Sequence, residues 1–235
     1  MIRRVAVVIP AANEEQRIGR CLAAVAAARR HLYHSDTTIA VRTVVVLDSC
    51  QDGTAVIAAA SREVQTVAIT AGSAGAARRA GVSAALVGAG PPGELWLAST
   101  DADSQVPVSW LTGMLAEARG GAHVVLGTVL PGRDLEPGTR AEWLRRHHLR
   151  DGHPHVHGAN FGIRADAYLN LGGWPPVVTG EDTELARRAA RSGHLRISRT
   201  ASIPVVTSVR SDGRAPRGFS SYLRDVAATT AELRT

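Results

Sequence analysis

Two carboxylates stand one residue apart in Asp101-Ala102-Asp103, directly after the apolar run 95–98. Such a run is typical of a buried strand, and two acids at its carboxyl end repel each other unless a cation lies between them. The pattern therefore predicts a site for a divalent metal and for the phosphate that it accompanies. The alternative is a surface turn, since Asp and Ser are common turn residues.

Other polar segments follow apolar runs in the same way. The segment 10–14 ends one apolar run, and Asp48 ends another. In an open sheet of parallel strands, ligands bind beyond the carboxyl ends of the strands. We therefore expect these residues to lie at one edge of a sheet, together with Asp101 and Asp103.

Short β-branched runs alternate along the chain with stretches of helical periodicity, which predicts a layered α/β fold with mostly parallel strands. Strands are expected at 3–10, 41–47, 64–69, 94–99, 124–129 and 201–207, and a further apolar segment lies at 159–163. Helices are expected at 14–32 with Asn13 as its cap, at 53–61, 74–88 and 107–119, and from near Gly180 onward.

The stretch 131–158 is rich in Gly, Pro, Arg and His and is expected to be irregular, as a mobile loop or lid. It holds histidines at 147, 148, 153, 155 and 157, whose spacing fits no standard zinc motif. An arginine-rich turn at 210–217 and an amphipathic helix are expected after the last strand. Arg210, Arg214 and Arg217 of this turn either close over an anion or form a solvated basic surface.

Composition excludes several classes of protein. With 235 residues, 45% of them hydrophobic and 20% charged, the chain has the make-up of one soluble globular domain. All 27 basic residues are arginine, which excludes Schiff-base lysine chemistry and the lysine of a phosphate loop. The net charge of +6 lies within residues 140–235, so we expect an anionic partner there. Nucleic acid is not expected, because no nucleic-acid-binding motif is present.

No apolar stretch reaches the roughly 18 residues that a membrane span requires. We expect a cytoplasmic protein without a transmembrane segment, and peripheral contact with the inner face of the membrane is one option for its location. A homodimer is one option for its oligomeric state. Cys21 and Cys50 match neither a disulfide framework nor a zinc motif and are expected to be plain thiols.

Four segments in order, AVVIPAANEE at 6–15, VVLDSCQDGT at 45–54, DADS at 101–104 and GEDTEL at 180–185, resemble the signature of family 2 glycosyltransferases. The resemblance extends over roughly residues 4–195. It implies the GT-A fold, an α/β domain whose Rossmann-like, mostly parallel central sheet is flanked by helices, with a smaller acceptor-binding part on the carboxyl-terminal side. One domain, 1–235, would comprise a nucleotide-sugar-binding half at 1–104 and an acceptor-binding half at 105–235.

The resemblance assigns the first half to a sugar donor, a UDP- or GDP-sugar. Asp103 would bind Mg²⁺ or Mn²⁺ on the donor diphosphate, and Asp101 would contact either this metal or the ribose. Carboxylates suit the base and ribose as well, because they accept hydrogen bonds from an imide N–H or a hydroxyl. The donor contacts implied are Pro10, Ala11, Asn13, Glu14, Asp48, Arg78, Asp101 and Ala102.

Several of these residues have structural alternatives. Asp48 could form an Asx turn after its strand, and Asp52 could cap the helix that follows. The glycine-rich segment 72–81 either brings backbone amides and Arg78 to a diphosphate or packs a helix closely.

In the second half, the resemblance gives Asp182 the role of general base for the acceptor hydroxyl. Glu181 and Glu184 are alternatives, as is a helix start enriched in acids for its dipole. The residues expected on the acceptor side are His157, Asn160, Trp174 and Glu181, with His157 as either an acceptor or a metal contact. Many relatives supply a histidine as a third metal ligand after the base, whereas the corresponding stretch 205–210 holds none.

The sequence thus predicts a metal-dependent inverting glycosyltransferase that moves a sugar from a nucleotide diphosphate to the hydroxyl of an acceptor, itself anionic or lipid-linked. A sugar-phosphate nucleotidyltransferase is one alternative, but this chain reads AANEE where such enzymes carry a glycine-rich phosphate loop. An inactive nucleotide-sugar-binding domain is the other, because of the missing histidine.

Overall fold

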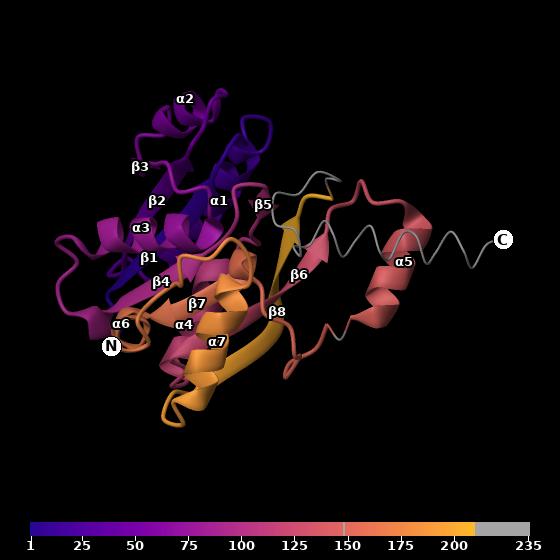
Figure 1. Cartoon of the computed structure of the whole chain (residues 1–235). Coiled ribbons are helices and arrows are strands. Elements are labelled where there is room, and N and C mark those ends of the chain that lie inside the picture. The colour runs from indigo at the N-terminus through magenta and orange to yellow at the C-terminus, as the bar shows by residue number, and fades with distance from the viewer. Residues whose placement is uncertain (148, 210–235) are drawn as a thin grey trace.

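A computed structural model describes residues 1–147 and 149–209 of the chain (Figure 1). The expectations for His148, for the turn 210–217 with its three arginines and for the final helix lie outside the described residues. None of the described helices combines the length and the apolar character that crossing a membrane demands.

One mixed sheet of eight strands forms the centre of the molecule, in the order β3-β2-β1-β4-β7-β6-β8-β5. Neighbours β1–β2, β1–β4, β2–β3 and β6–β8 are parallel, whereas β7 is antiparallel to β4 and β6, and β5 to β8. The mostly parallel sheet expected from the alternation is therefore confirmed. The strands are β1 (Arg4–Ala11), β2 (Ala40–Asp48), β3 (Val64–Ile69), β4 (Leu95–Ser99), β5 (Ser104–Gln105), β6 (Val124–Pro131), β7 (Phe161–Arg164) and β8 (Ile197–Thr207).

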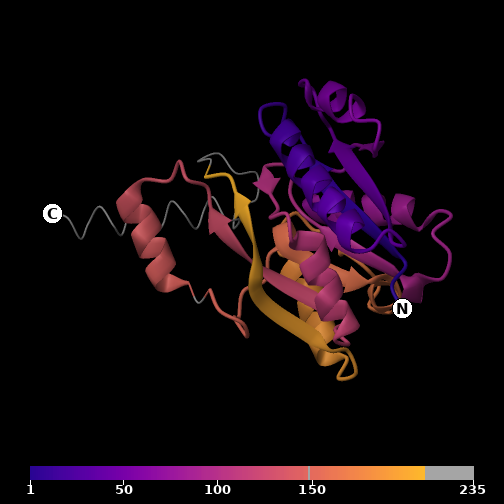
Figure 2. The same cartoon turned by 180° about the vertical axis from the view of Figure 1, so that it is seen from behind.

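Helices cover both faces of this sheet, as the two opposite views show (Figures 1 and 2). Alternate side chains of a strand point to opposite faces. Val5, Val7 and Ile9 of β1 accordingly pack under α1, α2 and α4, and Ala6 and Val8 pack under α3, α6 and α7. The helices are α1 (Ile18–Ser35), α2 (Thr54–Ala59), α3 (Ala74–Leu86), α4 (Trp110–Arg119), α5 (Pro137–Arg146), α6 (Ala165–Asn170) and α7 (Glu181–Arg191). The 3₁₀ turns are η1 (Pro92–Glu94) and η2 (Gly158–Asn160).

The first helix begins later than the sequence pattern predicts. Asn13 does not cap it, because its backbone takes a φ of 54° and its Oδ1 accepts a hydrogen bond from the Gln51 amide at 2.8 Å. Glu14 lies in the same loop, and its amide donates to Thr54 Oγ1 at 2.7 Å. These bonds join the loops after β1 and β2, so α1 starts at Ile18.

Two further expectations need correction. The stretch expected to be irregular contains α5, which begins with Pro137 at its first position and with Glu136 as a cap that accepts from the Thr139 amide at 2.7 Å. Trp143 of this helix is fully buried in a small separate cluster. The last strand, β8, begins at Ile197 and not at 201, since its polar first part pairs with the start of β6.

Candidate functional site

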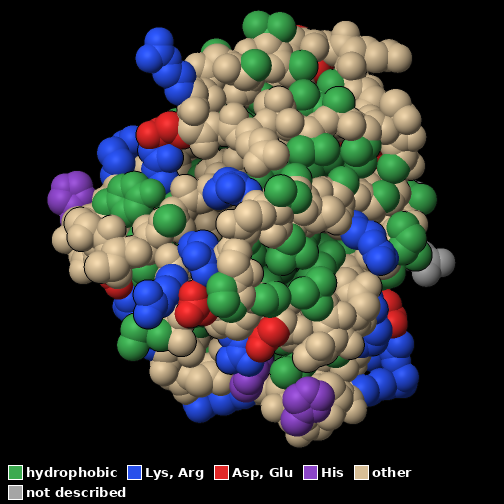
Figure 3. All heavy atoms as spheres, turned by 90° about the vertical axis from the view of Figure 1, so that its left-hand side faces the viewer, with side chains coloured by type: hydrophobic (Ala, Val, Ile, Leu, Met, Phe, Trp, Pro, Cys, Tyr) green, Lys and Arg blue, Asp and Glu red, His purple; other side chains and the backbone are tan. Residues whose placement is uncertain are grey.

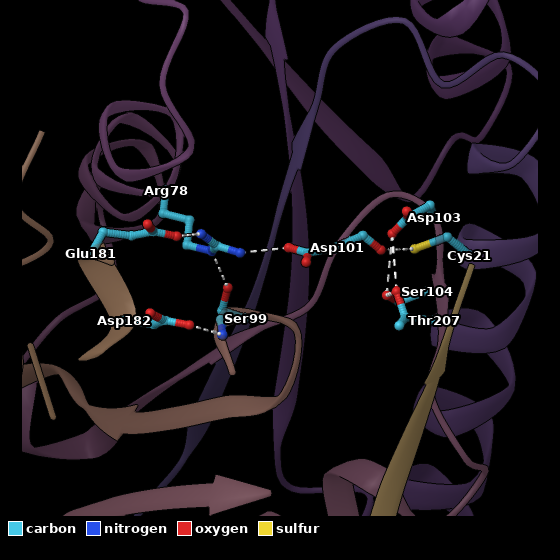
Figure 4. Close-up of polar contacts among 10 residues, drawn as sticks. Cys21, Arg78, Ser99, Asp101, Asp103, Ser104, Glu181, Asp182 and Thr207 are labelled. Atoms are coloured by element: carbon cyan, nitrogen blue, oxygen red, sulfur yellow. Dashed lines mark hydrogen bonds and ion pairs between the residues drawn. The ribbon is translucent and has the colours of Figure 1, made fainter. Parts of the chain in front are cut away.

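Asp101 and Asp103 follow β4 at the carboxyl edge of the parallel strands, as the sequence predicts. Their carboxylates face different neighbours (Figure 4). Asp101 forms an ion pair with Arg78, Oδ1 to Nη2 at 2.5 Å, and 36% of its side chain is exposed. Asp103 instead faces the end of β8. The two acids therefore link the site to two separate parts of the chain.

Arg78 binds several residues of the site at once. It lies on α3 and is 2% exposed. Its Nε donates to Ser99 Oγ at 3.0 Å, its Nη2 pairs with Asp101 and its Nη1 pairs with Glu181. The guanidinium also stands 5.4 Å from the ring centroid of Trp174. A buried cation needs partners of this kind, because an unpaired buried charge is very costly.

The pKa values of Asp101 and Arg78 are both shifted in this site. Burial raises the pKa of Asp101 to about 6, and the neighbouring carboxylates add to the rise, although Arg78 opposes it. Burial works against the charge of Arg78, but Asp101, Glu181 and Asp182 outweigh it and raise the pKa of Arg78. The residues drawn in Figure 4 include the acids Asp101, Asp103, Glu181 and Asp182 and the base Arg78, so together they carry a net negative charge.

Hydroxyl groups surround the carboxylate of Asp103. Ser208 Oγ donates to it at 2.6 Å, Thr207 Oγ1 at 3.3 Å and Ser104 Oγ at 3.4 Å. Antiparallel pairing of Ser104 with Thr207, where β5 meets β8, places them there. Thr207 and Ser208, from the stretch that holds no histidine, thus lie beside Asp103. Sequence reasoning missed the hydroxyls, since Ser and Thr at a strand end give no distinctive pattern.

The donor set around Asp103 suits a hard cation. Carboxylate and hydroxyl oxygens are ligands that Mg²⁺ accepts, together with water and phosphate. Within residues 1–147 and 149–209, no three His, Cys, Asp or Glu side chains meet at metal-binding spacing. Asp103 thus fits a cation that takes its remaining ligands from a diphosphate and water, whereas Asp101 is paired with Arg78.

Asp182 lies in the first turn of α7, after Gly180, whose φ of 84° turns the chain into the helix. Its Oδ2 accepts from the Gly158 amide at 2.8 Å, and its Oδ1 accepts from the Thr183 amide at 2.6 Å. Gly158 is required here, because a Cβ would stand 2.5 Å from Arg78 Nη2. The acceptor-side segment, the candidate base and Arg78 thus meet at one point.

His157 precedes Gly158 and belongs to a series of stacked rings. Trp143 and His147 stack with centroids 3.8 Å apart, His147 and His155 lie 5.0 Å apart, and His155 and His157 lie 6.0 Å apart. Burial lowers the pKa of His157 to about 4, with Asp182 acting against this and the other histidines adding to it. His157 is therefore neutral at physiological pH.

The low pKa of His157 predicts that acid destabilises the fold. An unfolded histidine titrates near pH 6.5, so between pH 6.5 and 4 the unfolded state binds more protons than the folded state. Stability should be complete above pH 6.5 and fall towards pH 4, by at most about 3 kcal/mol from this residue. Urea unfolding between pH 4 and 7 should show a shallower loss for His157→Gln than for the wild type. Equal slopes would contradict the assignment.

Asn160 is fully buried and faces the interior. Its Nδ2 donates to the carbonyls of Thr128 and Ile203 at 2.8 Å each, and its Oδ1 accepts from Trp110 Nε1 at 2.9 Å. Both N–H groups of the amide are used and the side chain has no exposed surface, so it joins β6, β8 and α4 inside the protein. The neighbouring Trp174 is also buried and packs edge-on against Phe161 at 4.9 Å.

Replacing Asn160 with alanine should lower the free energy of unfolding by about 3 kcal/mol or more. Two carbonyls and one indole N–H would lose their partners, and each buried unsatisfied group costs about 1–3 kcal/mol. Denaturant unfolding measures the loss. Asn170→Ala is the matched control, because Asn170 is exposed at the end of α6 and should change stability by less than about 0.5 kcal/mol.

Asp48 is 5% exposed and holds the loop that leads into α3. Its Oδ1 accepts from the amides of Ala71 and Gly72 at 2.8 and 3.0 Å, and its Oδ2 accepts from the Ser73 amide at 3.0 Å. These partners lie over 20 residues away in sequence, so this is no local Asx turn. Asp52 supports the start of α2, since its Oδ1 accepts from the Thr54 amide at 3.0 Å.

The other donor-side residues lie at the same edge of the sheet. Pro10 and Ala11 end β1, next to the loop of Asn13 and Glu14, and Ala102 is buried between the two acids of the pair. The structure thus brings together the polar residues that follow β1, β2 and β4.

Cys21 and a cavity elsewhere on the protein add no reactive group to this cluster. Cys21 is buried, its Sγ donates to the Asp101 carbonyl at 3.2 Å, and burial raises its pKa, which disfavours the reactive thiolate. A cavity of about 730 Å³ opens at the amino ends of β2 and β3, the opposite side of the sheet, between Arg29, Arg42 and Arg62. Figure 3 looks onto this side, where arginine and hydrophobic side chains adjoin.

Solved glycosyltransferase structures share this fold. The 1–349 fragment of S. aureus TarS in complex with UDP-GlcNAc is 15% identical and superposes with a TM-score of 0.66, over 97% of this chain and 66% of that one. The glucosyl-3-phosphoglycerate synthase of M. tuberculosis is 17% identical, with a TM-score of 0.54, over 98% and 80% of the two chains. This chain spans 43% of the longer TarS structure. The mostly parallel sheet flanked by helices is therefore the GT-A fold.

Sequence comparison identifies the family. No curated protein matches the chain. The model of the family described as glycosyl transferase family 2 matches residues 6–172, a span that contains the loops after β1 and β2, Arg78 and the acid pair Asp101 and Asp103. The chain belongs to glycosyl transferase family 2.

Proposed function

We propose that this chain is a metal-dependent inverting glycosyltransferase that moves a sugar from a nucleotide diphosphate to an acceptor hydroxyl. The observation that carries the proposal is the polar cluster at the carboxyl edge of the sheet. There Arg78 of the donor half pairs with both Asp101 and Glu181, and Asp182 binds the Gly158 amide beside it. Asp103 lies two residues beyond Asp101. A transfer reaction needs this junction, because the donor and the acceptor must be held side by side.

The charge of the cluster supports the metal dependence. A diphosphate adds negative charge to a site that already holds more carboxylates than cations, so it needs a compensating cation. Asp103 and Asp101 would hold Mg²⁺ or Mn²⁺, which supplies charge neutralisation to the departing diphosphate. Ser208 and Thr207 keep the Asp103 carboxylate in place for this task.

The donor is a UDP- or GDP-sugar, and the UDP-GlcNAc complex of TarS favours the UDP-sugar. The loop of Asn13 and Glu14 and the end of β1 would line the base and ribose. Asp48 supports them by fixing the amides of residues 71–73 at the start of α3.

On the acceptor side, Asp182 would remove the proton of the attacking hydroxyl. Inversion follows when this hydroxyl attacks directly, opposite the leaving diphosphate. His157 and Trp174 would flank this position, because His157 precedes Gly158, whose amide Asp182 binds, and Trp174 covers Arg78. The acceptor is anionic or lipid-linked, in keeping with the positive charge of residues 140–235 and with peripheral binding to the inner face of a membrane. Family membership argues against the nucleotidyltransferase alternative.

A thermal-shift screen tests the donor proposal. UDP-sugars and GDP-mannose are added with and without Mn²⁺, and a ligand that binds the folded state raises the melting temperature. We expect a shift of several degrees with at least one UDP-sugar that depends on Mn²⁺. The absence of a shift with every donor, with the folded state intact, would reject the proposal.

A further inference from the structure

The sequence motif of Glu181 does not explain where its side chain lies. The residue stands next to the candidate base, yet 9% of its side chain is exposed and its carboxylate does not face the acceptor segment. Its Oε1 instead pairs with Arg78 Nη1, 103 residues earlier in the chain. A buried carboxylate is stabilised only by partners of this strength, so this ion pair fixes where α7 begins.

The ion pair is one link of a continuous chain of contacts. Asp101 at the end of β4 binds Nη2 of Arg78, and Glu181 in the first turn of α7 binds Nη1. Ser99 of β4 accepts from Nε, so all three nitrogens of the guanidinium are engaged. A planar guanidinium holds its partners in a fixed fork, which makes the relative position of Asp101 and Glu181 rigid.

Packing around Arg78 leaves little freedom for another arrangement. A Cβ on Gly158 would stand 2.5 Å from the guanidinium, and a Cβ on Gly75 would stand 2.1 Å from the Pro175 carbonyl in the loop before α7. Trp174 covers the guanidinium from the same loop. The start of α7 is therefore seated directly on α3.

We infer that Glu181 is a positioning residue that acts through Arg78. It holds the first turn of α7, and with it Asp182, at a fixed distance from the metal-binding acids of the donor half. The inference rests on the proposed function and deepens it, because it assigns the contact that transmits donor binding to the acceptor side. Glu181 is then neither the base nor an acceptor contact.

Hydrogen exchange with UDP and Mn²⁺ as the probe tests the inference in the full chain. In the wild type, we expect UDP with Mn²⁺ to slow exchange of the amides at 183–186 in α7 as well as those near Asp101. Glu181→Gln should still bind UDP but lose the slowing in α7. Arg187→Gln is the control in the same helix, since Arg187 is exposed and pairs with Glu184, and it should behave as the wild type. Equal slowing in α7 of Glu181→Gln would overturn the inference.

Steady-state kinetics give a second readout. With a donor that is turned over, Glu181→Gln should lower kcat by about 10²-fold, the scale of a misplacement of about 1 Å, and change the donor KM by less than about threefold. Glu181→Asp, which keeps the charge, should recover part of the loss. A change confined to KM would overturn the positioning role.

A double-mutant cycle on urea unfolding separates this inference from the proposed function, because it needs no substrate. Arg78→Met and Glu181→Gln should be non-additive by about 10-fold in the unfolding constant, whereas Arg78→Met and Glu184→Gln should be additive. If UDP and its sugars fail to bind, the proposed function fails, and the cycle still decides whether Glu181 and Arg78 act as one unit. Additivity for Arg78 and Glu181 would overturn the link.

Discussion

Asp182→Asn should lower the rate of sugar transfer by about 10²- to 10⁴-fold, the usual contribution of a positioned general base. Asparagine has the same shape, and its one carbonyl oxygen can still accept from the Gly158 amide that Asp182 binds at 2.8 Å, although the bond from the Thr183 amide is then lost. The main loss is the capacity to take the acceptor proton. The affinity for UDP with Mn²⁺ should therefore stay within about threefold of the wild type, since kcat alone depends on a group that acts in the transition state.

Initial rates with a donor and acceptor pair check this result, and the melting temperature confirms that the variant is folded. Arg187→Gln, at an exposed position of the same helix, serves as the control and should keep the wild-type rate. If Asp182→Asn and the wild type turned over at equal rates, a different residue would have to be the base.

Asp103→Asn should weaken Mn²⁺ binding in the presence of UDP by about 100-fold or more. Replacing a residue that only hydrogen-bonds to a metal ligand typically lowers metal affinity by about 10–100-fold. Replacing a charged ligand itself should lower the affinity at least as much. The hydroxyls of Ser208 and Thr207 that surround Asp103 are neutral, so the Asp103 carboxylate supplies the negative charge that the metal needs there.

Titration calorimetry or the electron paramagnetic resonance signal of free Mn²⁺ measures this affinity. Ser208→Ala should lose about 10-fold, because the hydroxyl at 2.6 Å orients the carboxylate without carrying charge. A loss for Ser208→Ala that equals or exceeds the loss for Asp103→Asn would reverse the two roles. Unchanged Mn²⁺ binding in Asp103→Asn would remove this residue from the metal site.

Most of the fold could be predicted from the sequence, because the patterns that indicate strands and helices are local. The runs that became β1, β2 and β4 are mostly apolar on both faces, as parallel strands buried between helix layers must be. Residues that directly follow such runs, such as Asp48 and Asp101, necessarily lie at one edge of the sheet.

The partners of these residues were beyond the reach of the sequence, because they depend on long-range packing. No sequence pattern near Arg78 indicates that Glu181 is its partner. Likewise, no local pattern distinguishes an interior role of Asn160 from contact with an acceptor. Helix α5 was missed because Pro137 and the surrounding polar residues are typical of a loop, whereas Trp143 stabilises it by burial.

The release of nucleoside diphosphate from a sugar donor tests the central claim most directly. The full chain is incubated with UDP-sugars and GDP-mannose, with Mn²⁺ or with a chelator, and free UDP or GDP is measured over time. The account predicts slow release from at least one donor that requires Mn²⁺, is accelerated by an acceptor and is lost in Asp103→Asn. Donor binding without release from any donor, or release at equal rates in the wild type and Asp103→Asn, would contradict it.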